Sequence, residues 1–234
     1  MFKALLIPLT FVCTLATLGY DISLYPASKL TTSNLECLVK SGGQFFMIES
    51  YDDDGFANEN FASAYKSLYQ AGAKLVDTYA TICIYYSPDK LCSSVKSVLP
   101  DNFNGTVWLS INTYGDGCFG GTYTKFLETL ENYVKTCQSY GFKVGIYGRA
   151  SSYNARVAGD KIKVSPFLTT LPLRYEKYDK EANFDDFGDF DAGFGGWEMP
   201  TVKKYQGYQT ICEAPVGFNF RAPMNDKNKN LVFE

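Results

Sequence analysis

The chain has 234 residues, with 22 Lys and Arg, 25 Asp and Glu and no histidine, so its formal net charge is −3. The absence of histidine excludes Ser-His-Asp and Cys-His catalytic sites and His-based metal sites, and the mild acidity disfavours nucleic-acid binding, which usually needs a basic face. Hydrophobic residues make up 46% of the chain, which is the composition of a folded protein and not of an intrinsically disordered one. Its length suits one domain, since α/β barrels of about 200–250 residues fold as single domains.

Residues 1–19 are predicted to be a secretory signal peptide, with Lys3 at its positive end and an almost wholly apolar run over 4–16. This run is too short to span a bilayer, which takes about 20 residues. Cleavage after Gly19 or after Ala16 fits the small residues there, and the alternative is a buried N-terminal strand. No later apolar run is long enough to span a membrane, so we expect a secreted chain, in the extracellular space or a secretory-vesicle lumen.

Strand-like and helix-like segments alternate along the rest of the chain. The predicted strands, which are short runs rich in apolar residues, are 20–24, 44–49, 74–79, 106–111, 143–147, 171–175 and 202–205. The predicted helices are 31–39, 58–70, 122–140 and 151–157. Such alternation implies a largely parallel sheet, and about seven or eight candidate strands favour a closed α/β barrel. A Gly/Phe/Asp-rich loop at 188–196 and a polar tail at 221–234 are also expected.

Six cysteines remain after the one in the signal segment is removed, an even number that suits an oxidising compartment. Six cysteines allow 15 pairings. Our prediction pairs Cys37 with Cys212, Cys83 with Cys92, and Cys118 with Cys137. No Cys-x-x-Cys spacing occurs, so no zinc or redox site is expected. Asn104-Gly105-Thr106 is the N-glycosylation sequon of this sequence.

The carboxyl ends of the predicted strands carry many carboxylates and tyrosines, and in such barrels the chemistry sits at those ends. The residues there are Asp21, Glu49, Asp52, Asp53, Asp54, Asp77, Tyr79, Ser110, Asn112, Tyr114, Tyr147, Arg149, Tyr175 and Lys177. A rim of this kind suits sugars, and glycoside hydrolysis needs only two carboxylates, so no cofactor is expected. The run of three aspartates lacks the spacing of an EF-hand, so no metal site is expected.

Tyr20-Asp21-Ile22-Ser23 resembles the opening strand of glycoside hydrolase family 25, the Chalaropsis-type lysozymes, and more closely the lysozyme-like proteins of nematodes and some protists. Further matching motifs follow in order at 35–38, 71–73, 76–79, 145–147, 178–179, 183–187, 194–197, Pro200, 204–207, Cys212 and 216–220. The resemblance implies a distorted β/α (TIM-like) barrel over residues 20–220. It also implies cleavage of peptidoglycan between N-acetylmuramic acid and N-acetylglucosamine.

The departures from this family fall on its catalytic residues. The family places an Asp-x-Glu at the end of the fourth strand, with the Glu as proton donor, and here Ser110 and Asn112 stand in those places. Gly217 replaces a C-terminal Asp and Glu49 replaces an Arg, while the first-strand Asp21 is retained. A carboxamide has no proton to deliver near neutral pH, and general acid–base assistance is worth about 10²–10⁴-fold in rate.

The sequence therefore predicts a secreted, catalytically impaired lysozyme-like monomer that binds a bacterial cell-wall glycan or a related amino-sugar polymer. The resemblance suggests a setting in antibacterial defence. The predicted binding residues are Asp77, Tyr79, Tyr114, Tyr147, Tyr175 and Trp197. One alternative is an active muramidase that uses relocated carboxylates, drawn from Asp21, Asp116 or the run 52–54. Another is a barrel kept for an unrelated extracellular role.

Overall fold

The computed structural model describes residues 17–23, 30–112, 118, 125–157, 164–188 and 194–222, and eight strands in it close into a barrel in chain order. The strands are β1 (Thr17–Ile22), β2 (Phe45–Tyr51), β3 (Leu75–Thr81), β4 (Thr106–Ser110), β5 (Lys143–Gly148), β6 (Leu173–Glu176), β7 (Val202–Ile211) and β8 (Ala214–Arg221). Each neighbouring pair from β1 to β7 is parallel, and β8 is antiparallel to both β7 and β1. The predicted single-domain α/β barrel is confirmed.

The strand β8 is the main difference from the predicted parallel sheet. It follows β7 through a tight turn in which Cys212 and Glu213 both have positive φ, 54° and 60°. Two successive residues in the left-handed region match the twist of a β-hairpin. The hairpin therefore closes the barrel without an intervening helix.

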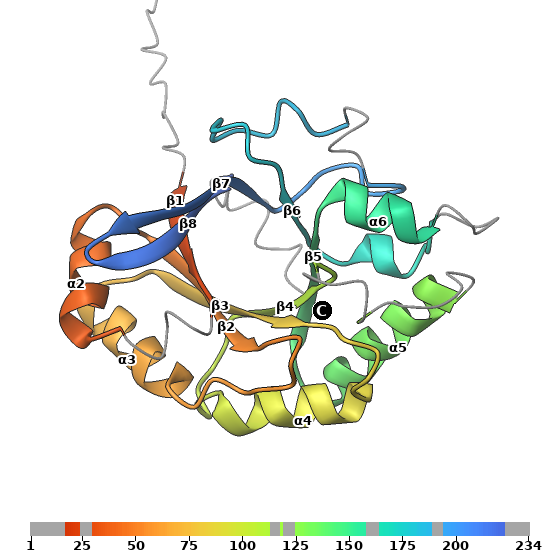
Figure 1. Cartoon of the computed structure of the whole chain (residues 1–234), viewed down its shortest axis with the longest axis horizontal. Coiled ribbons are helices and arrows are strands. Elements are labelled where there is room, and N and C mark those ends of the chain that lie inside the picture. Colours follow the sequence, from red (N-terminus) through yellow and green to blue (C-terminus); the bar gives the residue numbers. More distant parts are fainter. Residues whose placement is uncertain are drawn as a thin grey trace, which may run out of the picture.

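Helices surround much of the barrel (Figure 1). They are α2 (Thr32–Lys40), α3 (Phe61–Ala71), α4 (Pro88–Val98), α5 (Phe126–Ser139) and α6 (Ala150–Val157), with a 3₁₀ turn at Leu168–Thr170. Helix α4 is not among the predicted helices, although Ser87 caps it by accepting from Lys90 N and Pro88 occupies its first position. These helices bury their apolar faces against the outside of the barrel.

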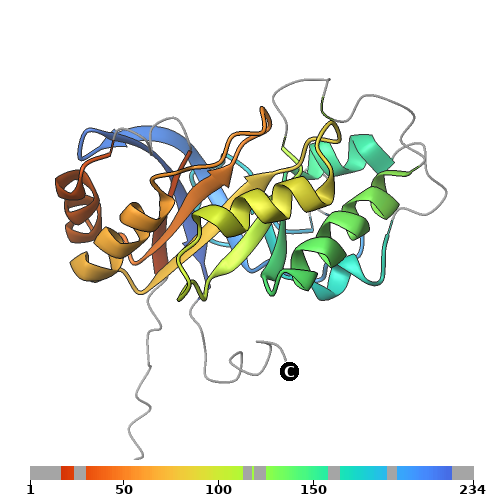
Figure 2. The same ribbon diagram turned by 90° about the horizontal axis from the view of Figure 1, so that it is seen from below.

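Large apolar side chains fill the part of the barrel interior nearest the strands' N-terminal ends. Phe45, Met47 and Trp108 are fully buried there with Val202. A Cβ on Gly145 would lie 2.5 Å from the Trp108 ring, so glycine makes room for the indole. The buried polar side chains Asp21, Glu49, Ser110 and Glu176 lie instead toward the carboxyl ends of the strands. Figure 2 shows these strand ends at its upper edge.

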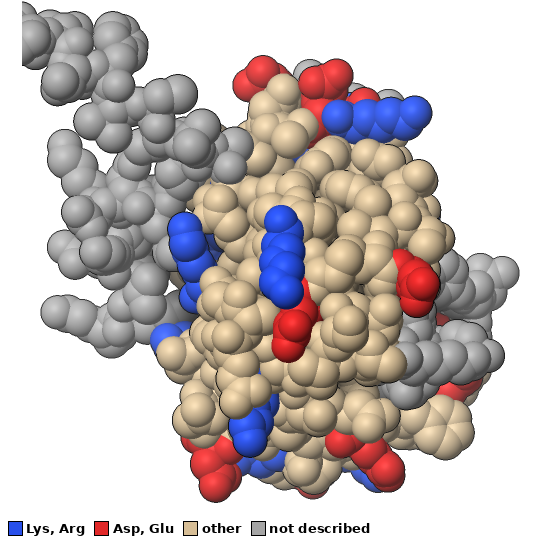
Figure 3. Space-filling view, turned by 90° about the vertical axis from the view of Figure 1, so that its left-hand side faces the viewer, with Lys and Arg blue, Asp and Glu red and all other residues tan. Residues whose placement is uncertain are grey.

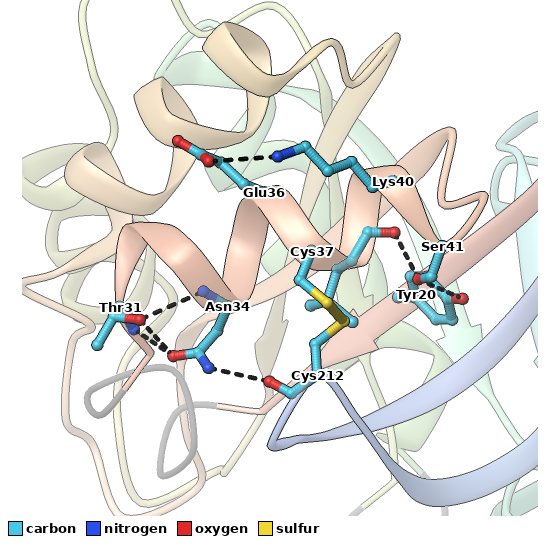
Figure 4. The surroundings of a disulfide bond; sticks show 9 residues. Tyr20, Thr31, Asn34, Glu36, Cys37, Lys40, Ser41 and Cys212 are labelled. Atoms are coloured by element: carbon cyan, nitrogen blue, oxygen red, sulfur yellow. Dashed lines mark hydrogen bonds and ion pairs between the residues drawn. A yellow bond between two sulfur atoms is a disulfide. The ribbon is translucent and has the colours of Figure 1, made fainter.

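The disulfides confirm one predicted pair and correct two. Cys37 of α2 is bonded to Cys212 in the hairpin turn, where Asn34 Nδ2 also donates to Cys212 O at 2.9 Å (Figure 4). The predicted pairs Cys83–Cys92 and Cys118–Cys137 are wrong, because the bonds are Cys83–Cys118 and Cys92–Cys137.

The corrected pairing follows from the helices. Cys92 lies on the buried face of α4 and Cys137 on the buried face of α5, and these two helices pack together. Cys83 instead follows the end of β3, and its disulfide goes to Cys118.

The first strand begins inside the segment predicted as a signal peptide. Thr17, Leu18 and Gly19 pair with the end of β8, and Leu18 O accepts from Gln44 N at 3.0 Å. Across the described ranges, no helix combines the length and apolar character that crossing a bilayer would require. The predicted tail lies mostly beyond the described residues, as do Tyr114 and Asp116.

Candidate functional site

The candidate site lies inside the barrel at the carboxyl ends of the strands, where the family resemblance places catalysis. We call this end the mouth of the barrel. Asn112 follows β4, and its Nδ2 donates to Glu176 Oε2 at 3.3 Å while its Oδ1 accepts from Arg149 N at 2.9 Å. Ser110 is buried, and its Oγ accepts from Asn112 N at 3.3 Å. Asn112 therefore joins the ends of β4, β5 and β6, and Ser110 holds the backbone of Asn112.

Glu176, at the end of β6, is the carboxylate that Asn112 contacts, and our sequence reading missed it. It is buried and accepts from Tyr147 OH and from Arg149 Nε, each at 2.6 Å. Burial alone would raise the pKa of Glu176, but the charges of Lys204 and Arg149 and its hydrogen bonds lower it below its ordinary value. Glu176 is therefore an ionised group near neutral pH and does not hold a transferable proton.

Asp21, the retained acid of the first strand, lies fully buried between two cations. It forms an ion pair with Arg174, and its Oδ1 is 3.0 Å from Lys204 Nζ. Burial opposes ionisation, but Lys204 and Arg174 outweigh it and lower the pKa of Asp21 below its ordinary value. The guanidinium of Arg174 also stacks on Tyr147, with 3.8 Å between its carbon and the ring centroid. Asp21 is thus part of an internal charge network.

Lys204 fills the space that the lost C-terminal carboxylate would need. A Cβ on Gly217 would lie 2.7 Å from Lys204 Cε and 2.8 Å from Asp21 Oδ1, which is closer than such contacts occur without rearrangement. The glycine at 217 and the lysine at 204 therefore depend on each other sterically.

Several predicted sugar-binding residues do not reach the mouth. Asp77 accepts from Thr106 N at 2.9 Å and from Trp108 Nε1 at 3.0 Å, which ties it to the start of β4 at the opposite end of the barrel. Tyr175 is buried outside the barrel and donates to Asp186 Oδ1 at 2.8 Å.

Trp197 is also core, since it packs against Tyr153 and donates to Leu171 O at 2.9 Å. The expectation for Asp77, Tyr175 and Trp197 is thus corrected. Strand alternation explains why the Tyr175 side chain lies outside the barrel, because its neighbours Arg174 and Glu176 take the inward positions.

Tyr79 and Tyr147 do point into the barrel, but both are buried beneath the mouth. Burial raises the pKa of each phenol well above its ordinary value, so both stay protonated. Their role here is to pack on Arg174 and, for Tyr147, to donate to Glu176.

Two half-exposed tyrosines that the sequence reading did not select stand at the mouth instead. Tyr178 is 47% exposed and Tyr208 is 40% exposed. Lys204 Nζ lies 6.0 Å from the centroid of the Tyr178 ring and 4.5 Å from that of Tyr208. We call Tyr178 and Tyr208 the inner pair, because they offer accessible aromatic faces directly beside the charge network.

The other predicted sites lie away from this group. Asp52 Oδ1 accepts from Phe56 N at 2.8 Å and so closes its own turn, and no group of three or more metal-binding side chains occurs among the described residues. Asn104 is exposed at the opposite end of the barrel, as an occupied sequon requires, and its glycosylation stays a prediction. Figure 3 shows mixed, scattered charges on the face that it displays, without a continuous basic patch.

Comparison with known proteins now decides the family. The family model described as Lysozyme-like protein 1 matches residues 16–205. The chain belongs to this family.

Individual relatives agree with that assignment. "Probable GH family 25 lysozyme 3" of Dictyostelium discoideum is 27% identical over 213 residues, covering 89% of this chain but only 42% of that protein. "Counting factor 45-1" of the same organism is 28% identical over 231 residues, covering 92% of this chain and 73% of its own. The fold matches a family GH25 lysozyme from Aspergillus fumigatus with a TM-score of 0.69 at 19% identity, covering 94% of this chain and all of that one. The family resemblance of the sequence is confirmed.

Proposed function

We propose that this lysozyme-like protein binds peptidoglycan, or a related amino-sugar polymer, at the mouth of the barrel without hydrolysing it. The observation that carries the proposal is the bonding of Asn112, an amide at the family's proton-donor position that holds Glu176 and Arg149 in place. Glycoside hydrolysis needs one protonated carboxyl and one carboxylate on either side of the scissile bond. Among the described residues of the mouth, Asp21 and Glu176 are anions held by cations, and neither is such an acid. The buried Glu49 at the end of β2 accepts from Thr81 Oγ1 at 3.2 Å.

Sugar binding is supported by the inner pair and by the polar groups around it. Aromatic rings with an exposed face and a polar hydroxyl suit ligands that are part apolar and part hydrogen-bonding. Arg149 is partly exposed beside Tyr178, with 5.4 Å between the guanidinium carbon and the ring centroid. Glu176 pairs with Arg149, and Asp21 pairs with both Arg174 and Lys204. Most of the charge at the mouth is thus neutralised within the protein, which favours a sugar of little charge over a strongly charged ligand.

The direct test is binding of the oxidised protein to insoluble peptidoglycan sacculi, with release of reducing ends measured in the same tubes. We expect saturable binding and no release. Tyr178→Ala/Tyr208→Ala should weaken binding about tenfold, because two aromatic contacts of about 0.5–1.5 kcal/mol each are lost. The matched Tyr178→Phe/Tyr208→Phe variant keeps the rings and should bind nearly as wild type does. Reducing-end release by wild type would instead support an active muramidase with relocated carboxylates.

We also propose that the protein is secreted, with processing before Thr17. Cleavage after Gly19 would remove half of β1, including the pairing of Thr17, Leu18 and Gly19 with β8, whereas cleavage after Ala16 leaves the strand whole. Amino-terminal sequencing of protein exported from eukaryotic cells should read Thr-Leu-Gly-Tyr-Asp. A mature end at Tyr20 would show that this part of β1 is dispensable. A role in antibacterial defence is part of the same proposal, and it requires that the sacculi bound include those of bacteria the producing organism meets.

A further inference from the structure

Three exposed apolar side chains stand on the turns that follow β2 and β3. Phe56 is 66% exposed, Tyr85 is 73% exposed and Ile84 lies beside Tyr85 in the chain with 41% exposed. We call these three residues the outer platform. Single exposed apolar residues are ordinary on protein surfaces, but these three stand on two turns that are joined to each other beside the mouth.

The two turns are joined to each other. Tyr86 OH donates to Asp54 O at 2.5 Å, and Gly55 lies so near the Tyr86 ring that a Cβ would be 2.6 Å from it. The turn after β2 is closed by Phe56 N donating to Asp52 Oδ1 at 2.8 Å and by Asp52 N donating to Phe56 O at 3.1 Å. Figure 2 shows both turns together at the upper edge, after the orange and yellow strands.

The turn after β3 is fixed as firmly. Cys83 is bonded to Cys118, Ile84 N donates to Cys118 O at 3.0 Å, and Tyr133 OH donates to Cys83 O at 3.1 Å. Phe56 and Tyr85 are therefore held toward solvent on pre-organised backbone. A ligand that stacks on them would lose little entropy in ordering the protein.

The outer platform lies across the mouth from the inner pair. In the closed order β1 to β8, the neighbours β2 and β3 are opposite the neighbours β6 and β7. Tyr178 follows β6 and Tyr208 lies on β7, so a straight strand that touches both groups crosses the mouth above Asn112 and Glu176. A polymer can make both contacts, whereas a short fragment at the mouth makes only one.

The negative charge beside the outer platform restricts which kinds of polymer can bind there. Asp52, Asp53 and Asp54 lie on the same turn as Phe56, and like charges repel anionic lipid surfaces, nucleic acids and polyanions. We propose that the outer platform is a second contact for an uncharged or amine-bearing polysaccharide strand that crosses the mouth, which gives the protein a preference for long glycans. This inference rests on the proposed function and extends it to chain length.

The test compares a soluble disaccharide, N-acetylglucosamine linked to N-acetylmuramic acid with its lactyl carboxyl amidated, with insoluble sacculi. In sacculi a peptide stem is amide-bonded to that carboxyl, so neither probe carries the lactyl charge. Phe56→Ala/Tyr85→Ala should weaken sacculus binding about tenfold and leave disaccharide binding within about twofold of wild type. Met199→Ala is the control, because Met199 is 68% exposed and lies just before β7 at the other end of the barrel. It should change neither affinity, and thermal unfolding should be the same for all three proteins.

The outcomes separate this inference from the proposed function. If wild type binds neither probe, the proposed function fails and the outer platform fails with it. If wild type binds sacculi and Phe56→Ala/Tyr85→Ala binds them equally well, only the outer platform is overturned. Equal loss of affinity for both probes would also overturn the outer platform as a second glycan contact. So would a wild-type dimer that Phe56→Ala/Tyr85→Ala converts to monomer, since the surface would then join two copies of the chain.

Discussion

A Ser110→Asp/Asn112→Glu variant is expected to release reducing ends from peptidoglycan at least 10²-fold faster than wild type, which we expect to be silent. The two substitutions return the acid and its neighbour to the end of β4, and general acid–base assistance is worth about 10²–10⁴-fold. The new carboxyl at position 112 would stand beside Glu176, whose Oε2 is 3.3 Å from the present Asn112 amide nitrogen. Two carboxylates this close raise the pKa of one of them, as a proton donor needs.

The gain should be incomplete because Lys204 still occupies the place of the third lost carboxylate. Adding Gly217→Asp alone should lower stability, since even its Cβ would meet Lys204 Cε at 2.7 Å and Asp21 Oδ1 at 2.8 Å. Combining it with Lys204→Ala removes the contact with Lys204 but leaves the one with Asp21 Oδ1, so this combination should recover part of the lost stability and raise the rate further. The measurement is reducing-end release with each set of variants, beside their thermal unfolding.

Two results would contradict this account. Hydrolysis by wild type would mean that another carboxylate acts as the acid. A well-folded variant with all four substitutions that binds sacculi yet stays silent would mean that the mouth has changed beyond the replaced carboxylates and Lys204. The Ser110→Asn/Asn112→Gln variant is the matched control, because it changes side-chain size at the same positions without adding an acid.

Most of the barrel could be predicted from the sequence because its parallel strands are short apolar runs between helices. Strand β4 and helix α5 were predicted within a few residues at their C-terminal ends. Helix α4 was missed because its apolar face is narrow, with Leu91, Cys92 and Val95 buried among polar residues. Strand β8 was missed because its pairing depends on a turn with two left-handed residues, neither of which is glycine.

The site was harder to predict than the fold. The lost carboxylates were recognisable by their motif, but Glu176 follows Tyr175 in a strand whose inward face depends on register. The aromatic Tyr175 is the residue that the sequence predicts at the site, whereas strand alternation places Arg174 and Glu176 inside the barrel. The disulfides Cys83–Cys118 and Cys92–Cys137 could not be predicted from spacing, since they depend on how α4 and α5 pack.

The second large effect concerns Asp21, where the structure and a catalytic role predict opposite behaviour. Asp21→Asn should destabilise the protein by about 3–5 kcal/mol, because it leaves Arg174 and Lys204 buried without their anion. For a chain of this length that corresponds to a fall in melting temperature of about 10 °C. The Asp21→Asn/Lys204→Met double variant removes one of the two cations as well, so its loss should be clearly smaller.

The pH dependence gives an independent measurement. Because the pKa of Asp21 is lowered in the folded state, its contribution to stability is present above the unfolded value near 3.8 and is lost as pH falls further. Urea unfolding should therefore show a steep loss of wild-type stability below about pH 4 and a shallower one in Asp21→Asn. If Asp21→Asn unfolds as wild type does but abolishes wall lysis, Asp21 acts on substrate and the active-muramidase alternative gains. If Asp21→Asn unfolds at lower urea concentration than wild type, and wild type itself shows no lysis, the retained acid serves the fold. The family's catalytic centre has then become an internal salt bridge beneath a sugar-binding surface.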